Sequence, residues 1–158
     1  MPQIHGVRRF LSIAILILVS ASLRGADDPL ARFKVVSIYP GTASLYVATV
    51  SMSFQPFVRQ RTEFSSTYSA RVFPYFFWSE KGRIWIIIAD DELRRVVRGE
   101  AVDFKGHALS DSGDGRRVEG RATPTGPSTG RIKVRVIISK RIVLSYDTTY
   151  ELKGAPAP

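Results

Sequence analysis

The side chains that most often carry out chemistry are scarce in this 158-residue chain. It has no cysteine, which excludes disulfides, thiolate nucleophiles and thiolate metal sites. Its two histidines are His5 and His107. His107 falls at an outward position of a predicted strand without the oriented neighbour that a general base requires. The one G-x-S-x-G match, "GPSTG" at Gly126–Gly130, lies in a predicted turn-forming loop and not at the strand-to-helix elbow that a nucleophile requires. We therefore expect a protein that is not an enzyme.

Two acidic pairs could in principle hold a metal ion or share a proton, but each has a simpler structural role. Asp111 and Asp114 lie in "DSGDG", whose residue types are typical of a hairpin turn. A calcium loop of the EF-hand type needs about six oxygen ligands spread over twelve residues. Asp90 and Asp91 open a short helical pattern, where capping accounts for both. We expect no metal and no cofactor.

Two short motifs resemble the nucleotide-binding motifs of the PilZ family. "RRVVR", Arg94–Arg98, is similar to its R-x-x-x-R arm, and "SDSGDG", Ser110–Gly115, is similar to its D/N-x-S-x-x-G turn. In that family the two motifs together grip cyclic di-GMP. Ser110, however, stands where the family has Asp or Asn. It also follows Arg98 by only twelve positions, fewer than the family needs for its first strand. The chain is therefore assigned to no family.

The strongest candidate for binding is "VFPYFFW", residues 72–78, which places five aromatic rings in seven positions. A predicted hairpin pairs Tyr75–Trp78 with Arg83–Ile88 across a four-residue loop. One face carries Tyr75, Phe77 and isoleucines, and we expect it in the core. The other face carries Phe76, Trp78, Arg83 and Trp85. This second face is core if a helix covers it, and a ligand pocket or partner patch if none does.

Two further features extend the candidate sites. A second predicted hairpin places Gly106 opposite Gly120, which leaves a hollow for a bulky neighbour or a ligand. The predicted ligand or partner site therefore combines Phe76, Trp78, Arg83, Trp85, Gly106 and Gly120. A basic stripe on an outward strand face is a second candidate, for contact with anionic surfaces, and consists of Arg131, Lys133 and Arg135.

The elements that must position these residues are mostly strands. Apolar residues alternate with polar ones over Ser44–Gln55, Phe64–Phe73, Arg131–Ile138 and Ile142–Leu152. A three-residue loop, Ser139–Arg141, keeps the last two strands facing one core and sets Lys133 opposite Asp147.

One short helix is predicted within "DDELRRVVRG", with Asp90 as its N-cap and Gly99 at the C′ position. A helix of this length must dock on another element, and we expect it to cover the aromatic hairpin. The chain is thus predicted to be all-β. It should form a single-domain antiparallel β-sandwich or small β-barrel of about eight strands, with one short helix near residues 90–98.

The N-terminal residues predict export. Arg8 and Arg9 precede the uncharged stretch 10–23, which is too short to cross a bilayer comfortably and is typical of a secretory signal peptide. Cleavage is expected between Ala21 and Ala26, with an uncleaved membrane anchor as the alternative. The predicted organisation is a signal peptide over 1–26, a β-domain over 27–153 and a disordered tail over 154–158. Removal of residues 1–26 leaves 20 basic and 14 acidic residues, a net charge of +6.

These features predict a periplasmic or secreted, non-catalytic β-domain that binds a partner through an aromatic surface. The partner could be a protein, an envelope polymer or a hydrophobic ligand, and nucleic acid is not expected in this compartment. Two alternatives stay open. One is a small barrel that carries a lipid or another hydrophobic ligand in the glycine hollow. The other is a small outer-membrane β-barrel with the aromatic residues as its girdle.

Overall fold

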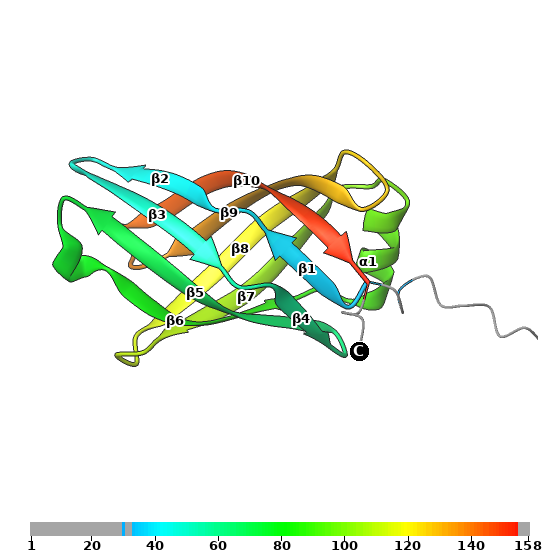
Figure 1. The fold of residues 1–158 in the computed structure, drawn as a ribbon, viewed down its shortest axis with the longest axis horizontal. Helices are drawn as coiled ribbons and strands as arrows, with labels where there is room; N and C mark the ends of the chain where they lie inside the picture. The colour runs from blue at the N-terminus through cyan, green and yellow to red at the C-terminus, as the bar shows by residue number, and fades with distance from the viewer. Residues whose placement is uncertain (1–29, 31–32, 155–158) are drawn as a thin grey trace, which may run out of the picture.

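The strands of the protein close into an eight-stranded antiparallel barrel, as the computed structural model shows for Leu30 and residues 33–154 (Figure 1). Pairing between β5 and β6 completes the ring. In ring order its members are β5 (Glu63–Phe73), β4 (Phe57–Gln60), β1 (Val35–Ile38), β10 (Val143–Lys153), β9 (Thr129–Ile137), β8 (Gly115–Pro124), β7 (Val102–Ser110) and β6 (Glu80–Ile87). The all-β prediction is confirmed, and of the two expected architectures the barrel is the one formed. The predicted signal peptide and the tail after Gly154 lie outside the described residues.

Two more strands extend the wall beyond the ring. β2 (Gly41–Leu45) follows β1 after Tyr39–Pro40, and β3 (Ala48–Phe54) precedes β4 across Gln55–Pro56. β3 pairs with β5, and β2 pairs only with β3. The single predicted strand over Ser44–Gln55 is therefore wrong in its first half. The chain reverses at Tyr46, whose φ is +40°, without the Gly, Asn or Asp that usually marks such a turn.

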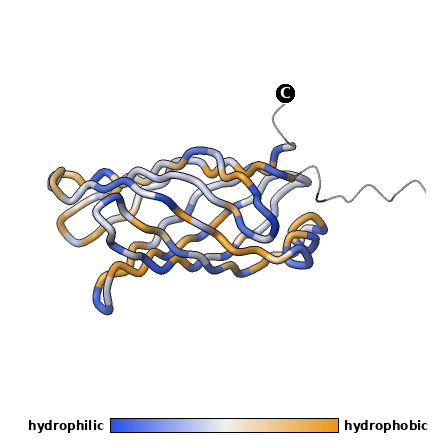
Figure 2. The backbone as a smooth tube through the Cα atoms, turned by 90° about the horizontal axis from the view of Figure 1, so that it is seen from below, coloured by the Kyte–Doolittle hydropathy of each residue, from blue (hydrophilic) through white to orange (hydrophobic). Residues whose placement is uncertain are grey.

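The inward positions of the strands form one continuous core. Hydrophilic and hydrophobic residues alternate along the strands (Figure 2), as expected when one face is buried and the other meets solvent. Val118, Val50 and Ile84 are among the most deeply buried side chains. Two small cavities between inward side chains of the described barrel measure only about 50 and 30 Å³. Most of the interior is therefore filled by side chains, as in other small barrels.

The helix α1 (Asp90–Val97) closes one end of the barrel. Its buried residues Leu93 and Val96 line the cavity of about 50 Å³ together with barrel side chains such as Phe104. The prediction that this helix covers the aromatic hairpin is wrong, because α1 and the aromatic segment lie at opposite ends of the molecule (Figure 1). None of the described helices is long and apolar enough to cross a membrane.

The two ends of α1 differ in how well the sequence predicts them. Gly99, at φ +86°, ends the helix, and its N–H and that of Glu100 bond to the carbonyls of Val96 and Arg95. That pattern is the Schellman motif, so the predicted C′ glycine is confirmed. The predicted cap Asp90 is wrong. Ala89 occupies the N-cap position, and its N–H donates to the Glu92 carboxylate at 2.9 Å.

Of the three predicted hairpins, one has the predicted register and two do not. In the last one, Lys133 lies opposite Asp147 and Ser139–Arg141 form the loop, as predicted. The aromatic hairpin is wrong, since β5 runs on to Phe73 and pairs Thr67 with Arg83. The remaining hairpin, β7–β8, is shifted, so that Gly120 lies opposite Phe104 and Gly106 lies opposite Val118. The two predicted facing glycines therefore do not meet.

Candidate ligand-binding site

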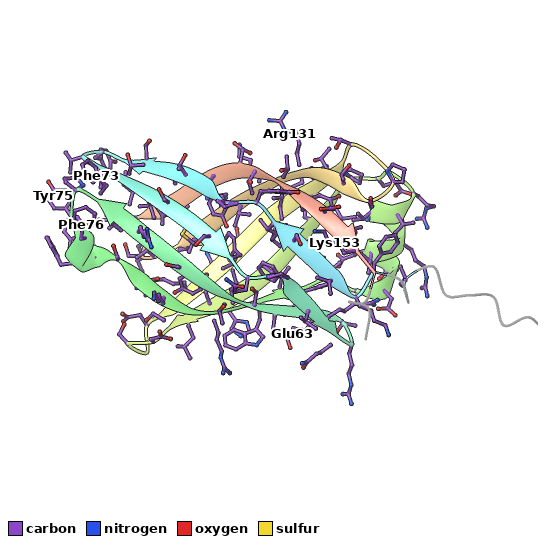
Figure 3. All side chains as sticks on the ribbon, in the orientation of Figure 1. Glu63, Phe73, Tyr75, Phe76, Arg131 and Lys153 are labelled. Atoms are coloured by element: carbon purple, nitrogen blue, oxygen red, sulfur yellow. The ribbon has the colours of Figure 1, made fainter. Side chains whose placement is uncertain are left out.

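The aromatic segment forms a short 3₁₀ helix, η1 (Phe76–Trp78), in the loop between β5 and β6. Tyr75 packs partly against the core, but Phe76, Phe77 and Trp78 are 67%, 77% and 58% exposed. Figure 3 shows Phe73, Tyr75 and Phe76 together at the end of the barrel opposite α1. The expectation that Phe77 belongs to the core is wrong. The rings gather at the barrel's open end, where nothing in the described chain covers them.

A cavity of about 880 Å³ opens at this same end of the barrel. Its lining combines inward side chains near the strand ends with exposed residues of the β2–β3 and β9–β10 turns. Trp78 and Ile142 stand at its rim. The inward residues that line it include Ala48, Val50, Ala70, Val72 and Leu144. Alanine at two of these positions leaves the space that a larger side chain would fill.

The cavity extends between the ends of β2 and β10 nearest the mouth, whereas Gly41 at the start of β2 lies close to Tyr146 of β10. β10 bonds to β1 as far as Ile38, and the Tyr39 N–H reaches the Thr149 carbonyl at 3.0 Å. Pro40, which has no N–H, then interrupts the ladder. β2 pairs with β3 on its other side and makes no described ladder with β10. The open end therefore has both an axial mouth and a lateral opening.

A half-buried polar cluster forms one side of the cavity. The Tyr68 hydroxyl donates to the Glu80 carboxylate at 2.8 Å, and the Arg116 guanidinium pairs with the same carboxylate at 3.2 Å. Burial, and then the hydrogen bond to Glu80, raise the pKa of Tyr68 above its usual range. The hydroxyl therefore stays protonated at neutral pH and donates, while the charges of Glu80 and Arg116 offset each other.

Two cations at the rim have no such partner. Lys140 and Arg141, in the β9–β10 turn, are exposed and line the cavity. Neither forms an ion pair within 4.0 Å with any described acidic residue. The mouth thus combines an apolar interior with two cations on the β9–β10 side of its rim. Such a site suits a molecule with an apolar body and an acidic end.

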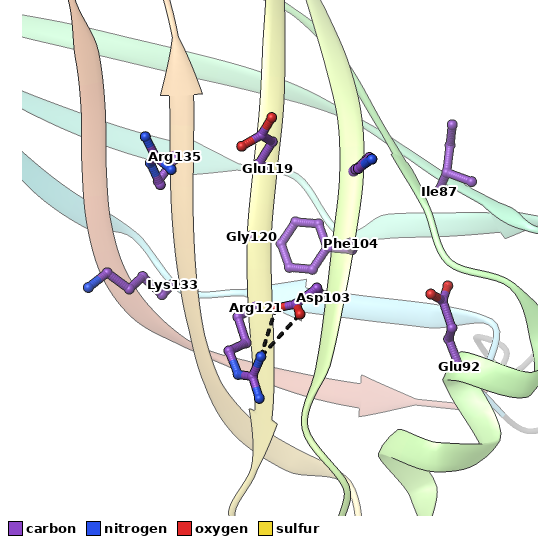
Figure 4. A pocket seen from close by; sticks show the side chains of 10 residues that line it. Ile87, Glu92, Asp103, Phe104, Glu119, Gly120, Arg121, Lys133 and Arg135 are labelled. Atoms are coloured by element: carbon purple, nitrogen blue, oxygen red, sulfur yellow. Dashed lines mark hydrogen bonds and ion pairs between the residues drawn. The ribbon is translucent and has the colours of Figure 1, made fainter.

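The six residues predicted as one ligand site are not brought together. Trp78 lines the mouth, with Phe76 exposed beside it. Arg83 and Trp85 lie on the outer wall, where the Trp85 ring stacks on His107 at 4.8 Å. Gly106 and Gly120 lie away from the mouth, and Gly120 lines a surface hollow of about 680 Å³ beside α1. The ring of Phe104 lies over Gly120, so the predicted glycine hollow is filled by the protein's own side chain (Figure 4).

The predicted basic stripe faces outward, and acidic residues accompany much of it. Arg131 projects from the outer wall (Figure 3), while Lys133 lies opposite Asp147 and Arg135 opposite Glu119. Lys133 and Arg135 also line a surface hollow of about 680 Å³ beside α1 (Figure 4). That hollow contains the Arg121–Asp103 ion pair at 3.0 Å and two more acids, Glu92 and Glu119. Its mixed charges make it a weaker anion site than the mouth.

Other chemistry finds little support in the described chain. No group of three or more His, Asp or Glu side chains that could hold a metal ion occurs among the described residues. The two motifs that resemble PilZ motifs also stay apart. Arg94 and Arg98 lie in and beside α1, whereas Ser110 and Gly115 flank the β7–β8 turn at the open end. One nucleotide could not contact both.

The most informative residues of the mouth were not singled out in the sequence. In the sequence, Lys140 and Arg141 resemble ordinary loop residues, and Tyr46 resembles a residue in the interior of a strand.

Comparison with protein-family models, curated proteins and solved structures found no match to this chain.

Proposed function

We propose that the barrel binds an amphipathic anion, of the size of a fatty acid or a lysolipid, at its open end. The apolar chain would occupy the cavity between Ala48, Ala70 and Val72, and the acidic head would contact Lys140 and Arg141. The observation that carries the proposal is the apolar mouth cavity of about 880 Å³ with two unpaired cations at its rim. Small-molecule sites of about 300–1,000 Å³ commonly lie in the mouths of β-barrels.

The proposal agrees with the exported, non-catalytic binding domain expected from the sequence, and it moves the site. The proposed ligand would occupy the mouth, instead of the hollow beside Gly106 and Gly120 that the sequence predicts. An outer-membrane barrel is less well supported, because outward strand positions carry charges such as Arg121, Lys133 and Arg135. A charged side chain facing lipid at mid-membrane costs about 2–4 kcal/mol.

Fluorescence of Trp78 can test the proposal. In a Trp85→Phe background, Trp78 is the only tryptophan, since the chain has two. We expect fatty acids added as monomers to change its emission in a saturable way. Each additional buried methylene contributes about 0.8 kcal/mol, so affinity should rise about fourfold per methylene until the cavity is full.

Two variants separate the cavity from its charged rim. Lys140→Gln/Arg141→Gln should bind a fatty acid no more tightly than the alcohol of the same length. Arg131→Gln/Lys133→Gln removes the same charge from the outer wall and serves as the matched control, with unchanged affinity expected. Ala70→Leu should weaken binding of acid and alcohol alike by filling the cavity. The proposal would be contradicted by an affinity that does not change with the length of the fatty acid, or by one that falls equally in both charge variants.

A further inference from the structure

The ligand cavity leaves the largest exposed aromatic surface unexplained. Phe73, Phe76 and Phe77 are between 63% and 77% exposed, and none of them lines the cavity. Edge contacts hold the segment together, with Phe73–Phe76 centroids at 5.7 Å and Phe77–Trp78 centroids at 5.3 Å. An exposed apolar cluster of this kind usually marks a surface that meets a partner or a membrane.

The neighbouring turn adds to this surface. Tyr46 and Val47, at the tip of the β2–β3 hairpin, are 102% and 71% exposed. Hydrophobic segments accordingly gather at the open end of the barrel, on the left in Figure 2. Both apolar tips point away from the described core, and they come from parts of the chain that only the closed barrel brings to one rim.

The loops around the mouth differ in character, so that the aromatic and cationic loops lie on one side and the acidic loop on the other. In ring order the four loops of this end are the β2–β3 turn, η1, the β7–β8 turn and the β9–β10 turn. The β2–β3 turn therefore lies between aromatic η1 and cationic Lys140–Arg141. The acidic β7–β8 turn, with Asp111 and Asp114, lies across the mouth from it. A tilt toward the β2–β3 turn brings three favourable loops to a flat surface and keeps the acidic one away.

We propose that this rim docks on a lipid bilayer that contains anionic lipid. Aromatic rings of η1 would enter the headgroup region, where Trp, Tyr and Phe combine apolar and polar contacts well. Lys140 and Arg141 would face the anionic headgroups, which attract cations near the surface. The exposed aromatic tips on adjacent loops, with two cations beside them, favour an anionic bilayer as the occupant. The docking goes beyond the ligand proposed above and does not require it.

The test uses the full chain in the Trp85→Phe background, with vesicles of phosphatidylcholine alone or mixed with an equal amount of phosphatidylglycerol. Brominated lipid quenches a tryptophan only when its ring enters the bilayer, so the signal reports Trp78 itself. We expect quenching with the anionic vesicles and at least about tenfold weaker partitioning to phosphatidylcholine alone.

Matched variants identify the contact surface. Phe76→Ser/Phe77→Ser should lower partitioning by about tenfold or more, because two large rings no longer leave water. Val58→Ser/Ile87→Ser removes exposed apolar side chains from the outer wall and should change nothing. Absence of Trp78 quenching, or equal loss in both variants, would overturn the proposal. So would self-association in sedimentation that the Phe76/Phe77 variant abolishes, since that outcome assigns the rim to a second copy.

The same variants keep this proposal separate from the proposed ligand. Ala70→Leu should lose binding of monomeric fatty acid and keep its partitioning to vesicles. Phe76→Ser/Phe77→Ser should do the reverse. If Ala70→Leu leaves fatty-acid binding unchanged, the ligand proposal is wrong. If Phe76→Ser/Phe77→Ser leaves vesicle partitioning unchanged, the docking proposal is wrong.

Discussion

Gly120→Ala should strongly destabilise the barrel, because the ring of Phe104 already occupies the space that a Cβ atom would need. An ideal Cβ at Gly120 would lie 2.2 Å from Cζ of Phe104 and 2.6 Å from the carbonyl oxygen of Lys133. Both distances are far below van der Waals contact, and the carbonyl belongs to the backbone of the neighbouring strand β9. Overpacking costs about 1–3 kcal/mol and more where the backbone must shift, so we expect about 3 kcal/mol or more.

A second substitution shows whether Phe104 causes this cost. Phe104→Ala would leave a cavity and cost about 3–5 kcal/mol, so the milder Phe104→Leu is preferable. Leucine withdraws the ring atoms from Gly120, which gives the new methyl group of Gly120→Ala part of the space it needs. The double variant should therefore lose at least about 1 kcal/mol less than the sum of the single losses. The carbonyl of Lys133 stays in place, so the relief is partial.

Urea unfolding followed by far-UV circular dichroism measures the four free energies of unfolding. Gly82→Ala provides the control, since the atoms nearest to its Cβ would be backbone atoms of Leu109 and Ser110 and not Phe104. Combined with Phe104→Leu, it should be additive. Additivity within about 0.5 kcal/mol for the Gly120→Ala pair as well would refute the reasoning. The hollow beside Gly120 would then be open in solution and available to a ligand.

Three further predictions concern other parts of the barrel. Burial raises the pKa of Tyr150 to about 12 from its usual 10, so ionisation of Tyr150 does not affect stability below pH 10 and lowers it as the pH rises from about 10 through about 12. Its hydroxyl is buried with no described hydrogen-bond partner, so Tyr150→Phe should raise stability by about 1 kcal/mol at pH 7 and flatten the alkaline loss, as urea midpoints would show. Arg59→Ala should cost about 1–2 kcal/mol of unfolding free energy by releasing Asp90 of α1, whereas Arg98→Ala at an exposed pair should change the unfolding free energy little. Glu80→Gln should tighten fatty-acid binding in a Trp78 titration, because it removes the only acid described in the cavity wall.

Local signals explain the parts of the fold that the sequence predicts. The β9–β10 register follows from two alternating strands and a three-residue loop, since a two-residue loop would turn one apolar face outward. The C-terminal end of α1 follows from Gly99, whose positive φ suits glycine. In both cases residues close in the chain determine the outcome.

The errors arise where side chains compete for backbone partners or where distant segments meet. The β7–β8 turn is tighter than predicted because the Ser110 hydroxyl accepts the Asp114 N–H at 3.0 Å, and Gly113 takes a φ of +92°. Each partner then shifts by two residues, which places Phe104 opposite Gly120. Similarly, Asp90 does not cap α1, because its carboxylate pairs with the guanidinium of Arg59 in strand β4. A single sequence does not reveal either competition.

The candidate site could not be predicted as a unit, because its parts come from loops far apart in the chain. Tyr46, Trp78 and Lys140 meet at one rim only after the ring closes. The aromatic run over residues 72–78 predicted a binding surface, but its strand-like alternation also predicted that half of its rings are buried. The chain instead makes a 3₁₀ turn there, and all three of its side chains stay exposed.

The two ends of the barrel interior differ in a way that bears on whether the mouth serves binding. Near α1, large side chains such as Phe57 and Phe104 fill the space, whereas Ala48 and Ala70 face the cavity at the mouth. If this space were only a packing defect, filling it would stabilise the barrel without further consequence. Ala70→Leu should raise the unfolding free energy by about 1 kcal/mol through added apolar burial and, in the same protein, weaken fatty-acid binding. Stabilisation with unchanged binding would place the ligand elsewhere, and destabilisation would show that the space at Ala70 is already filled in solution.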